Sequence, residues 1–157
     1  MVSASLFSAL LLVSIIRESA AFSRPIGATD GIYTFTANST SYMGSANVTK
    51  RNRLRDTGVH CETSVYFSTA DMDKAIEGLA QFFGTGNSFY ARSVSSYYGS
   101  AVAFGCNYGN GQHMDAEFFR NEQNLINTKC GSGRGGWNSH ESWKSSYGRT
   151  SAAKSFC

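Results

Sequence analysis

Three histidines, His60, His113 and His140, are the side chains best suited to acid–base chemistry at neutral pH. His60 has a carboxylate two residues further along the chain, on Glu62. Small secreted ribonucleases use a histidine, a glutamate and an arginine, and Arg92 could complete such a set from a neighbouring strand. His60 and Glu62, however, alternate with apolar residues, which places both on the solvated face of a strand. Ribonuclease activity therefore stays the alternative, and we expect no catalytic residue.

Exposed cations and a tryptophan indicate a second kind of chemistry, the recognition of a partner. Trp143 beside Lys144 would form an amphipathic contact patch, unless Trp137 and Trp143 instead pack against a helix. The glycine-rich residues 131–136 lack the Gly-Lys-Ser/Thr ending of a phosphate-binding loop and hold a single arginine, so we expect no nucleic-acid partner. The candidate binding residues are Lys74, Arg92, Arg134, Trp143, Lys144 and Arg149.

The four cysteines, Cys61, Cys106, Cys130 and Cys157, are expected to form two disulfides. No Cys-x-x-Cys occurs, so we expect neither a metal site nor any cofactor. Cys106 and Cys130 flank an expected helix about 24 Å long, whereas a disulfide needs Cα atoms within about 7 Å. Two pairings remain open, and we favour Cys61–Cys130 with Cys106–Cys157.

The first 21 residues have the pattern of a secretory signal peptide, with a small-x-small cleavage motif that ends at Ala21. Their apolar core, residues 6–16, would span about 16 Å as a helix, too short for a bilayer core of about 30 Å. We therefore expect a secreted, extracellular protein without stable membrane insertion.

Residues 22–51 differ from the rest because they hold the only proline and no cysteine. They carry two glycosylation sequons, at Asn38 and Asn47, and end in the dibasic pair Lys50-Arg51, a signal for kexin-type processing. We interpret them as a glycosylated pro-segment, which leaves 52–157 as the mature domain. That domain has ten basic and nine acidic residues, so its charge does not indicate an anionic partner.

The periodicity of the mature domain predicts the order strand, helix, strand, strand, helix, strand. Residues 59–67 alternate as in a half-buried strand, and Met72, Ile76, Leu79 and Phe83 recur on one helical face. Residues 98–100 form a hairpin turn between strands 89–97 and 101–108. A helix is expected over 114–129, with Met114, Phe118, Leu125 and Ile126 toward the core, and then a long loop with one or two short strands. The fold class is α+β: a split βαβ two-layer sandwich with two helices on one face of an antiparallel sheet, cross-linked by disulfides.

Residues 84–88, Gly-Thr-Gly-Asn-Ser, lead into a strand, Cys130-Gly131 ends the second helix, and an aromatic tail closes on Cys157. In these features, over residues 59–157, the chain resembles the smut-fungus killer toxin family and its cellular relatives. The resemblance implies a monomeric toxin or effector, antifungal or host-directed, that binds a cell-surface protein or channel. The toxins have more disulfides than four cysteines can form, and their functional lysine is replaced here by residues 81–83, Gln-Phe-Phe.

Overall fold

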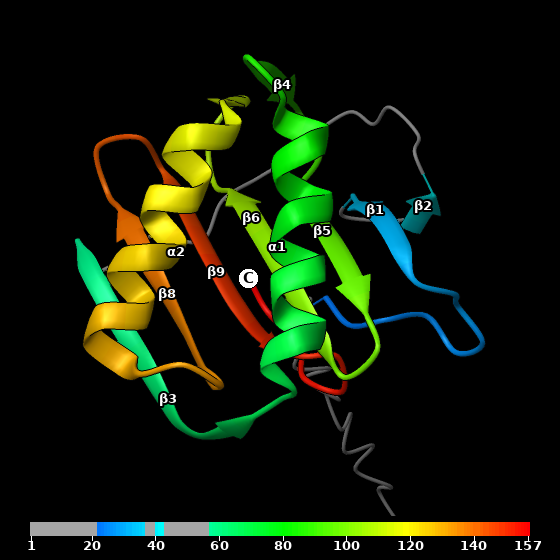
Figure 1. Ribbon diagram of the computed structural model, residues 1–157. Helices are drawn as coiled ribbons and strands as arrows, with labels where there is room; N and C mark the ends of the chain where they lie inside the picture. The colour runs from blue at the N-terminus through cyan, green and yellow to red at the C-terminus, as the bar shows by residue number, and fades with distance from the viewer. Residues whose placement is uncertain (1–21, 37–39, 43–56) are drawn as a thin grey trace, which may run out of the picture.

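The computed structural model describes residues 22–36, 40–42 and 57–157 (Figure 1). Their central element is a seven-stranded antiparallel sheet in the order β2-β1-β5-β6-β9-β8-β3. Its strands are β1 (Gly31–Phe35), β2 (Thr40–Tyr42), β3 (Gly58–Tyr66), β5 (Ser93–Tyr98), β6 (Ala101–Asn107), β8 (Arg134–His140) and β9 (Ser145–Ser151). A separate pair is formed by β4 (Asn87–Phe89) and β7 (Gln112–Met114).

Two helices, α1 (Thr69–Phe83) and α2 (Ala116–Cys130), lie side by side on one face of the large sheet (Figure 1). The predicted α+β class with two helices on one face of an antiparallel sheet is therefore confirmed. In the chain, α1 lies between β3 and β5 of the large sheet and α2 lies between β6 and β8. The strands of each pair are not neighbours in the sheet, a topology compatible with a split βαβ arrangement.

Helix α1 begins and ends where the local sequence predicts. The Ser68 side chain accepts a hydrogen bond from the backbone N–H of Asp71 at 3.3 Å, and Gly84 ends the helix at a φ of 54°. Met72, Leu79 and Phe83 are fully buried against the sheet, as their spacing requires. The apolar face predicted for this helix is confirmed.

Helix α2 begins two residues later than predicted, because Met114 is buried as part of β7, and it turns a different face to the core. Phe119 and Ile126 are fully buried, and the polar Glu122 and Gln123 are buried between them. Leu125, predicted to face the core, is 52% exposed, so that prediction is wrong. Phe118 and Leu125 have the same seven-residue spacing as Phe119 and Ile126, so the spacing alone does not decide between the two stripes. The structure buries the second stripe and leaves Leu125 outside it.

The opposite face of the sheet is covered by the two ends of the described chain. Phe22 forms a β-bridge with Phe156, and the rings of Phe35 and Phe104 both pack on Phe156. These residues form a second apolar cluster, distinct from the one under the helices. Residues 22–36 therefore supply one strand and several core side chains to the same sheet.

Both favoured disulfides are confirmed: Cys61–Cys130 joins β3 to the end of α2, and Cys106–Cys157 joins β6 to the C-terminal tail. The hairpin turn at residues 98–100 is also confirmed. The expectation of a long loop after α2 is wrong, because β8 and β9 form a hairpin of seven-residue strands. The strand expected over 89–97 is divided, with β4 ending at Phe89 and β5 beginning at Ser93.

Candidate functional site

The histidine, glutamate and arginine of the ribonuclease alternative do not come from neighbouring strands. His60 and Glu62 lie on the edge strand β3, whereas Arg92 directly precedes β5. Three strands separate β5 from β3, which is about 19 Å at the usual strand spacing. That part of the sequence-based interpretation is wrong, because strands close in the sequence need not be neighbours in a sheet.

His60 and Glu62 are instead engaged in contacts within the sheet. The His60 ring stacks on Trp137 with centroids 5.3 Å apart, and its Nε2 lies 3.0 Å from Ser139 Oγ. Glu62 accepts a hydrogen bond from Thr150 Oγ1 at 2.8 Å. The alternative that both tryptophans pack against a helix is wrong for Trp137, which packs against the apolar cluster on the face opposite the helices. It is right for Trp143, whose ring lies 5.5 Å from that of Phe118 on α2.

The third histidine, His140, lies in a buried polar cluster that sequence reasoning missed. Its Nε2 lies 2.8 Å from Glu122 Oε2, which also accepts a hydrogen bond from Asn138 Nδ2 at 2.8 Å. Glu122 is only 3% exposed. The sequence did contain a signal for this cluster, because Glu122 lies four residues before Ile126 on the stripe of α2 that faces the core. A buried charge occurs only with partners, so a carboxylate at this position indicates a polar cluster.

Three of the predicted binding residues lie at one end of the sheet, just before β5 and β9, together with an aromatic residue that the sequence did not single out. We call the set Tyr90, Arg92, Trp143 and Lys144 the end surface. Tyr90 is 61% and Trp143 49% exposed, and Lys144 is exposed beside Trp143. The end surface therefore presents two exposed aromatic rings and one exposed cation, Lys144, whereas Arg92 is partly buried.

Well-ordered contacts hold the end surface in place. Trp143 stacks on His140 with centroids 4.5 Å apart, and its backbone carbonyl accepts a hydrogen bond from Gln112 Nε2 at 2.8 Å. The backbone N–H of Tyr108 donates to the Lys144 carbonyl at 2.7 Å. The Arg92 guanidinium lies over the Tyr108 ring, 5.3 Å from its centroid. The surface is thus pre-organised, which lowers the entropic cost of binding.

The other three predicted binding residues lie away from the end surface. Lys74 lies over the Tyr98 ring and donates a hydrogen bond to the Tyr98 hydroxyl at 3.1 Å, which raises the pKa of Lys74. Arg134 lies over the Tyr66 ring and donates to the Thr63 carbonyl. Cation–π contacts of this kind fix cations in place at exposed sites.

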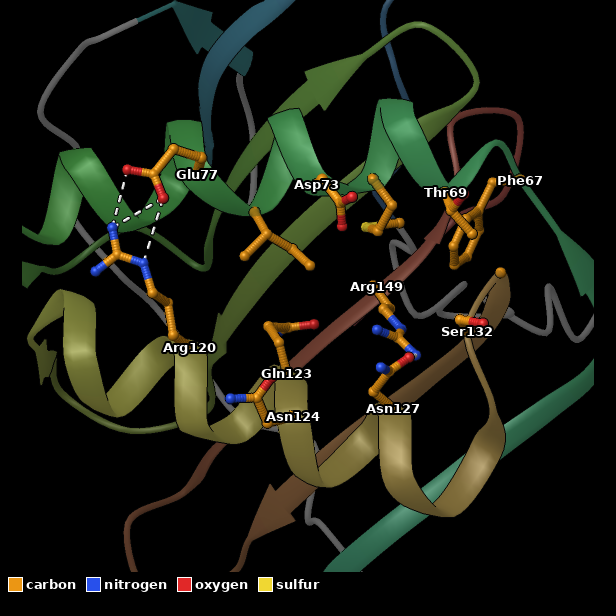
Figure 2. A pocket seen from close by; sticks show the side chains of 13 residues that line it. Phe67, Thr69, Asp73, Glu77, Arg120, Gln123, Asn124, Asn127, Ser132 and Arg149 are labelled. Carbon is orange, nitrogen blue, oxygen red and sulfur yellow. Dashed lines mark hydrogen bonds and ion pairs between the residues drawn. The ribbon is translucent and has the colours of Figure 1, made fainter.

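The prediction that Arg149 is an exposed cation is wrong. Arg149 is 96% buried and lies at the floor of a groove between the two helices (Figure 2). Its Nη2 donates to Asn127 Oδ1 and to the Gly131 carbonyl, and its Nε donates to the Arg134 carbonyl, at 3.0–3.1 Å. Burial lowers the pKa of Arg149. These contacts fix the guanidinium against the C-terminal end of α2, where carbonyl groups favour a cation.

The groove has a volume of about 510 Å³, within the range typical of small-molecule sites. At one end Arg120 and Glu77 form a two-pronged ion pair across it, with distances of 2.8–3.2 Å (Figure 2). Between this pair and Arg149, Gln123 and Asp73 line the space. Sequence reasoning missed the groove, because its residues come from both helices and a sheet strand.

Several predicted sites lie outside the described residues: the cleavage motif at Ala21, the sequons at Asn38 and Asn47, and the dibasic pair Lys50-Arg51. Within the described ranges, no helix is long and apolar enough to cross a membrane. The same ranges contain no group of three or more histidine, cysteine, aspartate or glutamate side chains placed to hold a metal ion.

Comparison with known proteins leaves the interpretation to the residues and their geometry. No protein-family model, curated protein or solved structure matches this chain.

Proposed function

We propose that the protein is a secreted, killer-toxin-like protein that binds a protein or channel on the surface of a competing or host cell and inhibits that cell. The observation that carries the proposal is the end surface, where exposed Tyr90 and Trp143 lie with Arg92 and Lys144. Tryptophan, tyrosine and arginine are the residues that most often dominate the energy of protein interfaces. The two disulfides fit a protein that works outside the cell.

The charges of the end surface suit the early steps of binding. Cations at the rim of an interface steer a partner and fix its orientation, and the effect weakens as salt is added. The stacked rings of Trp143 and His140 would supply the apolar contact area. An anionic surface protein with an apolar pocket therefore suits this face.

The first prediction tests this surface. Trp143→Ala combined with Lys144→Ala should raise the half-inhibitory concentration against sensitive fungal or plant cells by at least about tenfold, because it removes an anchor and its neighbouring charge. Leu125→Ala, which removes an equally exposed apolar side chain from α2, and Lys154→Ala, which removes an exposed lysine, should change it less than twofold. Circular dichroism would check that all variants fold.

The ribonuclease alternative is tested in the same preparation. If trace amounts of protein degrade RNA, and His60→Ala abolishes the cleavage, the alternative replaces the proposal. The proposal would also be contradicted if the oxidised protein inhibited none of the fungal and plant cells tested. Inhibition without RNA cleavage, weakened by the Trp143/Lys144 variant, is the expected result.

A further inference from the structure

The groove between α1 and α2 contains polar groups with unused hydrogen-bonding capacity. Within the described part of the chain, Arg149 Nη1 donates no hydrogen bond, and the buried Gln123 Oε1 accepts none. Gln123 is 3% exposed, and its Nε2 reaches only the Gly148 carbonyl, at 3.5 Å. Buried polar atoms normally have partners, so an orphaned acceptor beside a half-used guanidinium requires an explanation.

The charges of the groove cancel. Glu77 and Arg120 neutralise each other, and the Asp73 carboxylate extends from α1 toward the side of the groove where the Arg149 guanidinium lies (Figure 2). Asp73 forms no hydrogen bond within the described residues. A simple anion would be repelled by Asp73, and a simple cation would be repelled by Arg149. The lining therefore favours a neutral ligand that both donates and accepts hydrogen bonds.

We propose that the groove binds a neutral sugar unit. A hydroxyl group donates one hydrogen bond and accepts two, so neighbouring hydroxyls can accept from Arg149 Nη1 and donate to Gln123 Oε1 and to Asp73. Asn124 adds an amide, and its side chain forms no hydrogen bond within the described residues. The proposal rests on the proposed function only for the source of the sugar, which would be a glycan at the surface of the target cell.

Apolar side chains complete the match to a sugar. Phe67, Met72 and Ile76 line the groove beside its polar groups. A sugar ring has the same mixed character, because its C–H faces are apolar and its hydroxyl edge is polar. Mostly pre-formed sites with a few convergent polar groups on an apolar lining are typical of small-ligand binding.

The experiment is a titration of the full oxidised protein, followed by NMR of the backbone amides, with four neutral probes: the methyl glycosides of glucose, mannose, galactose and N-acetylglucosamine. Trisaccharides of the responding sugar and the matching insoluble wall polysaccharide then separate a free sugar from a wall glycan as the ligand. We expect at least one probe to shift the amides of residues 123–127 and 132–133. Sodium acetate serves as the carboxylate comparison.

Three variants test the assigned contacts. Asp73→Ala and Asn124→Ala should each weaken sugar binding by about tenfold, whereas Asn121→Ala, an exposed asparagine on the same helix, should not. Gln123→Met should weaken binding to a similar extent and leave the melting temperature unchanged or raised, because it replaces an unpaired buried acceptor by an apolar group. If Gln123 had only a structural role, its replacement would lower the melting temperature together with sugar binding.

The outcomes are distinct. If no probe shifts the groove amides, if acetate shifts them more than every sugar, or if the Asp73 and Asn124 variants bind like the unmodified protein, the sugar proposal is wrong. If it fails while the Trp143/Lys144 variant still loses inhibitory activity, only the sugar site is refuted and the proposed function stands.

Discussion

Individual residues show where function and folding compete in this molecule. Glu122 occupies a core position of α2, where an apolar residue would be the ordinary choice. Its carboxylate receives Asn138 and His140, and His140 in turn supports the exposed Trp143. The polar cluster thus links a buried carboxylate to the end surface. A fold that needed only stability could have used a leucine at this position.

The second prediction concerns this carboxylate. Glu122→Ala should lower the free energy of unfolding by roughly 3 kcal/mol, because it leaves Asn138 Nδ2 and His140 Nε2 without their shared acceptor. Urea unfolding measures the difference. Glu117→Ala, on the exposed side of the same helix, should cost less than about 1 kcal/mol. Equal costs for the two variants would show that the buried cluster contributes nothing specific.

Among the elements, the N-terminus of α1 is clamped to the β5–β6 turn. Asp71 accepts hydrogen bonds from the backbone N–H of Ser100 at 2.9 Å and from its hydroxyl at 2.7 Å. The Ser100 hydroxyl oxygen also accepts a hydrogen bond from the Ser68 backbone N–H at 3.0 Å. Both bonds lower the pKa of Asp71 below its usual 3.8, and the bond from the Ser100 backbone has the larger effect. One carboxylate therefore joins a helix cap to a hairpin turn.

The third prediction follows from that lowered pKa. A carboxyl group whose pKa is lower in the folded state contributes stability above its unfolded pKa and loses that contribution as the pH falls through its folded pKa. Asp71→Asn should therefore lower the melting temperature at pH 7, and the difference from the unmodified protein should shrink below pH 3.8. Thermal melts at pH 7 and in this acidic range measure it. A difference that stays constant with pH would contradict the assigned role.

The Cys61–Cys130 disulfide is the second connection between elements, because it fastens the edge strand β3 to α2 across 69 residues of sequence. The fourth prediction is that Cys61→Ser combined with Cys130→Ser lowers the unfolding free energy by roughly 2–4 kcal/mol and the melting temperature by roughly ten degrees. Calorimetry measures both. If the reduced, unmodified protein melts within a few degrees of the oxidised form, the disulfides are not a main source of stability.

At the scale of the whole molecule, the sheet has an apolar cluster on each face, and residues 22–36 belong to the one opposite the helices. β1 pairs with β5 over five residues, and Tyr33 and Phe35 are buried. Whether the chain is cleaved after Arg51 stays a prediction. If it is cleaved, the segment is expected to remain attached, because its loss would expose an open edge and apolar rings to water.

The fifth prediction states that consequence. After treatment with a kexin-type protease, the fragment that carries β1 should coelute with residues 52–157 in native size-exclusion chromatography and separate only on denaturation. Phe35→Ala should promote its release, because it removes a ring that is 2% exposed, at a cost of about 3–5 kcal/mol. A folded, secreted protein that begins at Asn52 and lacks the fragment would contradict this prediction.

The sequence by itself determined the features that depend on neighbouring residues. The extent of α1 follows from its cap at Ser68, its apolar period and Gly84, and the β5–β6 hairpin follows from its turn. The cysteine pairing followed in part, because helix length made the Cys106–Cys130 bond unfavourable. Each of these signals acts within about 25 residues.

Only the tertiary structure decided which distant segments meet. It added β1 to the sheet, separated Arg92 from His60, turned Leu125 outward and brought Gln123 inward beside Arg149. The end surface likewise joins Tyr90 to Trp143 across the fold. Strand order and helix rotation are set by the burial of side chains from many elements at once, so they cannot be predicted from a pattern of neighbouring residues. The candidate sites are therefore visible only in the folded molecule.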